Sequence, residues 1–384
     1  MKKIIPVIWL IVGLFALIVG CGGSGHVADR TLQAGEPVTL SCAPKFVENI
    51  SACVHAATDY EPRRNMSHDD QWDACPSDTY YTNYVFPLVV GPSPPGGGIG
   101  RVNAWEDMAK KLWGSGTVPP KENFADALVI YGMGDGSISS RAVRRQDIHY
   151  PDIPNNSKTR CTEPGVADTY PDRCVGPAKI VPILNRAFEA AIQNGVEPLS
   201  QSARIEAALI WFSYVSVLAE QGTCRDTPED CDSVWSHYNA ALAENTTIQK
   251  GLGRYFKDLS EETHARVFDG VLAVSCWRHL DPAPLATNTI LYEWAQRQMD
   301  IGMLRGVALI LRDRFSHLLA CSPSDVKKAH LAFINTLGPF MDRAARAKNP
   351  SQADILQAQV TATDPSRVDV PRALAAIDAL FPCP

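Results

Sequence analysis

Residues 200–221 read SQSARIEAALIWFSYVSVLAEQ, and this stretch decides the fold. Within it, residues 207–219 (AALIWFSYVSVLA) contain no charge, proline or glycine, so a helix over them is apolar on every face. Such a helix lies buried among other helices or spans a membrane. A span needs about 20 apolar residues, and this run is shorter. We therefore predict the central helix of a folded core.

Further segments with apolar residues at helical spacing surround this helix along the chain. The predicted helices are residues 176–194, 200–221, 232–244, 260–280, 286–320, 324–347, 354–362 and 371–380. Their connections are mostly short, which favours antiparallel neighbours. The sequence has no fixed period of the kind that a solenoid of repeats would show. We expect an all-α, multi-helix array.

The sequence before residue 176 predicts less regular structure. Residues 103–113 and 123–131 predict short helices, but turn-forming residues dominate elsewhere. Residues 92–100, PSPPGGGIG, are interpreted as a loop and linker because proline and glycine interrupt regular structure. The protein is thus expected to be mainly α, with an irregular, disulfide-tied region at 41–175 followed by an all-α domain at 176–384.

The first 25 residues predict export. Lys2 and Lys3 precede the uncharged residues 4–20, which is the plan of a secretory signal. The next residues complete a motif, because residues 18–21 (IVGC) resemble the lipobox of bacterial lipoprotein precursors. The resemblance implies cleavage before Cys21 and acylation of Cys21 with palmitate-like chains. Each buried CH₂ contributes about 0.8 kcal/mol, so two or three chains hold a protein firmly to a bilayer.

This interpretation divides the N-terminal region into a signal peptide at 1–20 and a lipidated tether at 21–40. The alternative is a signal anchor that is not cleaved. An inner-membrane retention signal would resemble Asp after the lipidated cysteine, whereas this chain has Gly22. The expected location is the cell envelope, and the outer membrane if the host is Gram-negative.

The charge balance narrows the range of partners. Removal of residues 1–20 leaves 34 basic and 42 acidic side chains, a formal net charge of −8. The sequence contains no basic block and no basic residues interleaved with aromatic ones, which argues against nucleic acid. The predicted partners are the bilayer, through acylated Cys21, and an envelope protein or ligand that the sequence does not identify.

The cysteine count agrees with export. Besides Cys21, the chain has an even number of cysteines, which predicts up to five disulfides. These are Cys42, Cys53, Cys75, Cys161, Cys174, Cys224, Cys231, Cys276, Cys321 and Cys383. Spacing predicts local Cys161–Cys174 and Cys224–Cys231 bonds. Cys276 and Cys321 lie on neighbouring predicted helices and are expected to join them, whereas the other four cannot be paired from the sequence.

Isolated polar residues in very apolar helices are the candidate site. Glu206 and Glu220 share one face of the central helix, Asp269 is the only charge in residues 267–277, and Arg305 is the only charge in residues 301–311. Converging acids and arginines could form a polar ligand pocket or a carboxylate metal site. The alternatives are a narrow solvated seam, or a structural ion pair of Arg305 with Asp269 or Glu206.

Catalytic and metal motifs are weak or missing. One Glu-x-x-His pair, Glu261 and His264, has no second copy, so a di-iron bundle is not predicted. The sequence contains neither a His-Glu-x-x-His zinc motif nor a Gly-x-Ser-x-Gly nucleophile elbow. We predict no cofactor, metal or catalytic residue. The first hypothesis is a non-enzymatic binding or interaction module of the envelope. The second is a helical lipoprotein that binds a small ligand or metal through the polar residues.

Overall fold

A computed structural model describes residues 31–48, 96–133, 137–154, 159–227, 229–240, 250–280 and 289–382. The predicted signal peptide, Cys21, Cys53, Cys75 and Cys383 lie outside these ranges, as does the side chain of Cys276. The mainly α prediction is confirmed. Within the described residues, the one extended pairing is a single antiparallel bridge between Pro37 and Thr117.

The helices of the first half include α6, which packs against α5 and α7. They are α1 (Gly96–Lys111), α2 (Lys121–Gly132), α3 (Ile138–Ala142), α4 (Val166–Thr169), α5 (Val181–Glu189), α6 (Pro198–Cys224) and α7 (Glu229–Asn239). Helix α5 is extended at both ends by π-helical turns, over Gly176–Ile180 and Ala190–Asn194.

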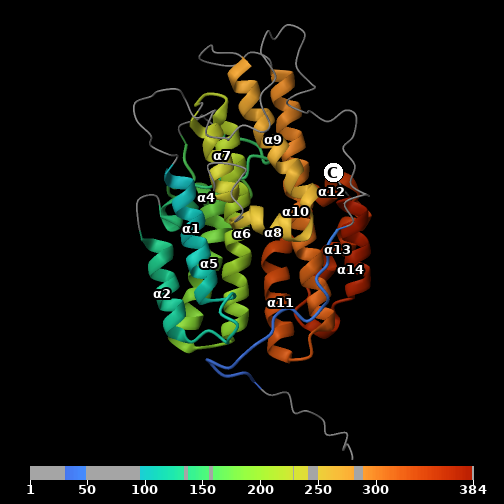
Figure 1. The fold of residues 1–384 in the computed structure, drawn as a ribbon. Coiled ribbons are helices and arrows are strands. Elements are labelled where there is room, and N and C mark those ends of the chain that lie inside the picture. Colours follow the sequence, from blue (N-terminus) through green and yellow to red (C-terminus); the bar gives the residue numbers. More distant parts are fainter. Residues whose placement is uncertain are drawn as a thin grey trace, which may run out of the picture.

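The second half begins with α8 (Gly251–Leu259), α9 (Glu261–Leu280) and α10 (Thr289–Ala320), which lead into a terminal group. That group contains α11 (Ser324–Leu337), α12 (Asp342–Lys348), α13 (Pro350–Val360) and α14 (Val370–Leu380), with 3₁₀ turns at Gly338–Met341 and Pro365–Arg367. Figure 1 shows the long helices running roughly along one axis, with α8 crossing between them.

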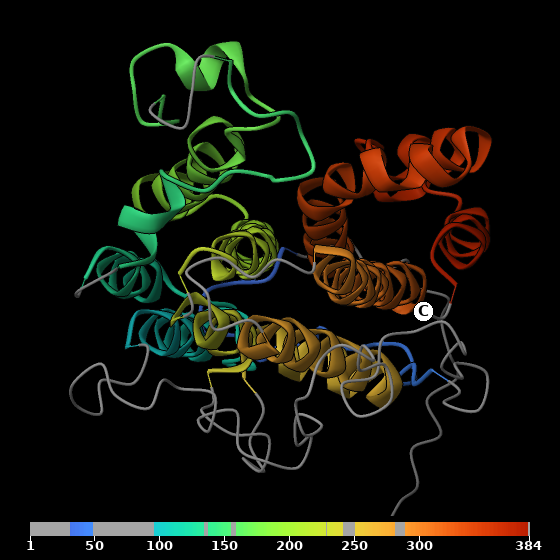
Figure 2. The same cartoon turned by 90° about the horizontal axis from the view of Figure 1, so that it is seen from above.

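Helix α6 is the centre of the core, as its sequence predicts. It packs against α5, α7 and α11, and Figure 2 shows it in the middle of the bundle. Nearly all of its side chains are buried. By length and composition α6 could cross a membrane, but 89% of its most apolar window is buried inside the protein. It is therefore explained as a core helix.

Helices α9 and α10 form a closely packed pair, and α10 also contacts α8, α11 and α14. The close approach depends on Gly270, where an added Cβ would lie 2.6 Å from the Cβ of Met299. Real Cβ atoms do not approach that closely, so any side chain at this position would push the two helices apart.

The linker predicted around residues 96–100 is wrong, because α1 begins at Gly96. Packing explains why glycines are helical there. A Cβ on buried Gly98 would collide with the Ser236 hydroxyl and lie 2.8 Å from the Nδ1 atom of His237. Closeness to α7 thus compensates for the low helix propensity of glycine. Side chains of α1 and α2 join the same hydrophobic core as α6 and α10.

Residues 31–48 cross the lower end of the bundle in Figure 1 and then follow its side. We call this segment the strap. It is held by backbone hydrogen bonds from Gly35 N to Val118 O (2.8 Å) and from Glu48 N to Leu259 O (2.8 Å). Between these points, a Cys42–Cys321 disulfide joins the strap to the end of α10.

The disulfide pattern corrects one prediction and agrees with two. Cys321 pairs with Cys42 and not with Cys276, because the strap lies against the end of α10. The Cys161–Cys174 and Cys224–Cys231 bonds are present, as their short spacing predicts. The strap is thus covalently tied to a residue 279 positions away.

Candidate functional site

The four polar residues predicted as one pocket have separate surroundings. Glu206 pairs with Arg314 on α10, whereas Glu220 pairs with Arg145, which follows α3. Asp269 is partly exposed on α9. The four residues therefore do not form one pocket. Of the four, Glu206 lies at a large cavity.

Arg305 serves a different contact. Its guanidinium bonds the carboxylate of Glu48 on the strap and the backbone carbonyl of Phe381. Burial lowers the pKa of Arg305 to about 10, which leaves it cationic at neutral pH. This ion pair fixes the end of the strap to α10.

A cavity with a volume of about 550 Å³ lies between α1, α6, α8, α10 and the strap. We call it the strap cavity. Leu40, Ser41 and Lys45 of the strap contribute to its lining. Volumes of roughly 300–1,000 Å³ are typical of small-ligand sites.

A buried polar network forms one wall of the strap cavity. The Tyr255 hydroxyl and Nη2 of Arg314 each donate to Oε1 of Glu206, both at 2.6 Å. The indole N–H of Trp113 donates to the Tyr255 oxygen at 3.1 Å. Burial, and then the negative charge of Glu206, raise the pKa of Tyr255 well above its usual value. Tyr255 therefore keeps its hydroxyl proton and donates a hydrogen bond to Glu206.

The tyrosine is held by its ring as well as its hydroxyl. Its ring stacks on Trp105 with centroids 5.7 Å apart, and the Arg254 guanidinium lies 5.5 Å from the ring centroid. Arg254 also pairs with Glu106 at 3.1 Å. Contacts on both the ring and the hydroxyl fix the orientation of Tyr255 in the cavity wall.

His317 positions the strap at the edge of the strap cavity. Its Nδ1 atom accepts hydrogen bonds from the backbone N–H groups of Cys42 and Ala43, each at 3.1 Å. An accepting Nδ1 carries no proton, so the ring is neutral and its proton lies on Nε2. That nitrogen is 3.3 Å from Oδ2 of Asp313. The histidine therefore acts as a positioning residue.

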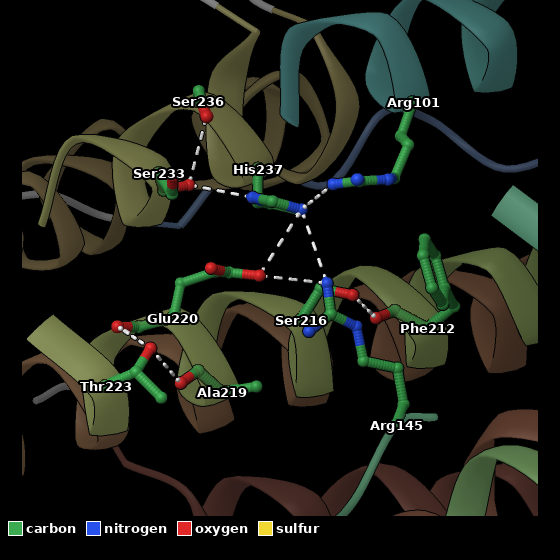
Figure 3. Close-up of polar contacts among 10 residues, drawn as sticks. All are labelled: Arg101, Arg145, Phe212, Ser216, Ala219, Glu220, Thr223, Ser233, Ser236 and His237. Atoms are coloured by element: carbon green, nitrogen blue, oxygen red, sulfur yellow. Dashed lines mark hydrogen bonds and ion pairs between the residues drawn. The ribbon is translucent and has the colours of Figure 1, made fainter. Parts of the chain in front are cut away.

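A second buried polar cluster joins α1, α6 and α7 (Figure 3). His237 Nδ1 lies 2.8 Å from the Ser233 carbonyl, so this nitrogen carries the proton. Its Nε2 atom then accepts from Nη1 of Arg101 at 2.7 Å and faces Nη2 of Arg145 at 3.4 Å. The same Nη2 atom donates to Glu220 at 3.1 Å.

The charges in this cluster keep His237 neutral. Burial lowers the pKa of His237 well below its usual value, and the positive charges of Arg145 and Arg101 lower it further. A histidine in this state accepts a hydrogen bond but does not supply a proton at neutral pH. The arrangement is suited to holding three helices together.

A third cluster lies between α6 and α10. His149 Nδ1 is 2.8 Å from Asp147 and Nε2 is 3.1 Å from Asp300, while the Tyr214 hydroxyl donates to Asp300 at 2.7 Å. Burial alone would lower the pKa of His149, but hydrogen bonds to the two carboxylates outweigh it and raise the pKa to about 9. Both ring nitrogens are thus committed to structural ion pairs.

The described residues contain no group of three or more His, Cys, Asp or Glu side chains arranged to hold a metal. His264, of the single Glu-x-x-His pair, lies 2.8 Å from the Tyr238 hydroxyl through Nδ1. Burial lowers the pKa of His264 to about 4. Glu261 lies near Lys257, with 3.4 Å between Nζ and Oε1. The pair thus has structural partners.

Sequence reasoning missed most residues of the strap cavity. Trp113 lies in a segment without a distinctive motif, and Arg314 lies in a polar part of α10. One signal was present, since Glu206 is a lone carboxylate in an apolar helix.

A scan against protein-family models, a search of curated proteins and a search of solved structures each found no match to this chain.

Proposed function

We propose that this protein is a bacterial lipoprotein, held at the cell envelope by acyl chains on Cys21, whose helical domain is a non-enzymatic binding module. The lipobox-like sequence at residues 18–21 supports the anchor. Gly22 favours the outer membrane if the host is Gram-negative. The bound molecule is a small ligand, and its site is the strap cavity.

The strap cavity is the observation that carries the binding function. It combines apolar wall residues with polar groups held in fixed orientations, and such groups set the orientation and specificity of a bound ligand. Glu206 is only 1% exposed and is held by two hydrogen bonds at 2.6 Å. A carboxylate fixed in this way is pre-organised for recognition, because its geometry is set before a ligand arrives.

Native mass spectrometry tests the binding function. Protein purified from its own membranes without denaturation is expected to retain a small molecule of defined mass. Ser41 is exposed at the cavity lining, so Ser41→Trp should fill the space and reduce the bound fraction at least tenfold. Ser351→Trp, at an exposed position on α13, is the matched control. A wild-type spectrum containing only the acylated protein mass would refute the binding function.

Cell fractionation tests the anchor. Cys21→Ser removes the acylated thiol, so labelling with radioactive palmitate should disappear and the protein should leave the membrane fraction. The double variant Cys224→Ser/Cys231→Ser serves as a control, since it removes two cysteines that lie in a local disulfide. Full membrane retention of Cys21→Ser would instead indicate an uncleaved transmembrane anchor.

A further inference from the structure

We infer that the strap cavity recognises a neutral, polyhydroxylated ligand of the saccharide class, an inference that rests on the proposed binding function. Three features of the cavity support this inference: the balance of charge around it, the hydrogen-bonding groups that face it, and its aromatic wall.

The charges that line the strap cavity are balanced. Four lysine or arginine side chains and four carboxylates contribute to the lining, and His317 is neutral. Three of the acids lie in ion pairs with lining cations, namely Glu206–Arg314 at 2.6 Å, Glu106–Arg254 at 3.1 Å and Asp258–Lys45 at 3.8 Å. A ligand with a net charge would compete with these pairs and leave a partner uncompensated. The balance favours a neutral ligand.

The buried ion pair nevertheless offers hydrogen bonds to a ligand. Both hydrogen bonds to Glu206 use Oε1, and its Oε2 atom has no hydrogen-bond partner among the described residues. Arg314 donates to Glu206 through Nη2, and within the described part of the chain its Nη1 and Nε atoms have no acceptor. An acceptor and a donor therefore stand side by side on one rigid pair.

A hydroxyl group matches this arrangement best. It donates one hydrogen bond and accepts others, so hydroxyls can bond the carboxylate and the guanidinium together. An ammonium group only donates, and a carboxylate only accepts. Either would satisfy one member of the pair and leave the other without a partner, which is costly in a buried site.

The remaining walls suit the faces of a sugar ring. Trp113, Leu259 and Ile310 contribute apolar surface, and the indole N–H of Trp113 is already bonded to Tyr255. The indole therefore presents its apolar ring, not its donor, to a ligand. A saccharide ring has C–H groups on its faces and hydroxyls at its edge. A purely apolar ligand would fit the walls but leave Glu206 and Arg314 unsatisfied.

The test is titration of the purified, acylated protein in detergent, followed by tryptophan fluorescence and calorimetry. The neutral probes are maltose, cellobiose and N,N′-diacetylchitobiose, and the charged probes are the cationic glucosamine dimer and the anionic digalacturonate. We expect saturable binding of a neutral probe, at least tenfold tighter than that of either charged probe. Glu206→Gln removes the charged acceptor and should weaken binding at least tenfold, because hydrogen bonds to charged groups are strong.

Two further variants keep the test decisive. Trp113→Leu changes a half-buried wall residue and should also weaken binding. It tests the site independently if Glu206→Gln fails to fold. Glu122→Gln, at an exposed position on α2, should bind as the wild type does. Absence of saturable binding by every neutral probe overturns the inference, as does tighter binding of a charged probe or unchanged binding by Trp113→Leu. If a small molecule is still retained in the native mass spectrum, the proposed binding function stands and only the ligand class is wrong.

Discussion

Removal of the Cys42–Cys321 bond should destabilise the protein more than removal of a local disulfide. In the chain-entropy relation, the stabilisation grows with the logarithm of the loop that a disulfide closes. The separation of 279 residues for Cys42–Cys321 gives about 5.5 kcal/mol, whereas the separation of 7 for Cys224–Cys231 gives about 2.5 kcal/mol. The expected difference is therefore about 3 kcal/mol.

Urea unfolding followed by circular dichroism measures this difference. The double variants Cys42→Ala/Cys321→Ala and Cys224→Ala/Cys231→Ala are compared with the wild type. For a slope near 3 kcal/mol per M, a 3 kcal/mol difference separates the two midpoints by about 1 M. Equal midpoints, or a lower midpoint for the Cys224–Cys231 variant, would refute the reasoning.

The remaining predictions concern helix packing and titration. Gly98→Ala should lower the free energy of unfolding by about 1–3 kcal/mol, because the added methyl group clashes with α7. Gly100→Ala has open space around it and should be neutral or stabilising by up to about 1 kcal/mol. Equal unfolding temperatures for the two variants would contradict this prediction. The pKa of His149 is raised to about 9, so its stabilisation is complete below about pH 6.5 and is lost as pH rises through about 9. His149→Asn should remove that slope from urea midpoints measured across the alkaline range. The pKa of His237 is lowered, so stability should fall as pH drops below about 6.5, and a His237 NMR titration at its usual pKa would refute the buried neutral state.

The fold could be predicted where one signal was strong enough to dominate. The apolar run of α6 is too short to span a membrane and therefore predicts a buried helix. The structure buries it, as predicted. Glycines gave the opposite result at residues 96–100, because local propensity favours a linker while close packing on α7 requires small residues in a helix. Helix α8 was not predicted at all, since Gly251 and Gly253 obscure a short pattern whose buried side is formed by Phe256 and Leu259. Propensity is a weak guide where tertiary packing selects the residue.

The candidate site was predicted in part for a related reason. Glu206 is conspicuous as a lone charge, but its partner is Arg314 and not Arg305. The two arginines are nine positions apart on α10, so they point about 180° apart around a helix with 3.6 residues per turn. Arg305 faces Glu48 and Phe381, whereas Arg314 faces Glu206. Sequence alone does not reveal which face of α10 meets α6. It also does not predict that the strap contacts Arg305 and lines the cavity at Glu206.

The position of the disulfide in the strap also has a mechanical consequence. If the chain is anchored at Cys21 as proposed, a pull from the membrane enters the described fold at Thr31. It meets the hydrogen bond from Leu32 N to Asp325 first, then those around Gly35, and then a covalent bond at Cys42. That bond passes the tension directly to the end of α10 at Cys321. The part of the strap beyond it, which carries Lys45 and Glu48, is then outside the line of force, so the Glu48–Arg305 ion pair stays unloaded, whereas Leu40 and Ser41 of the cavity lining bear the tension.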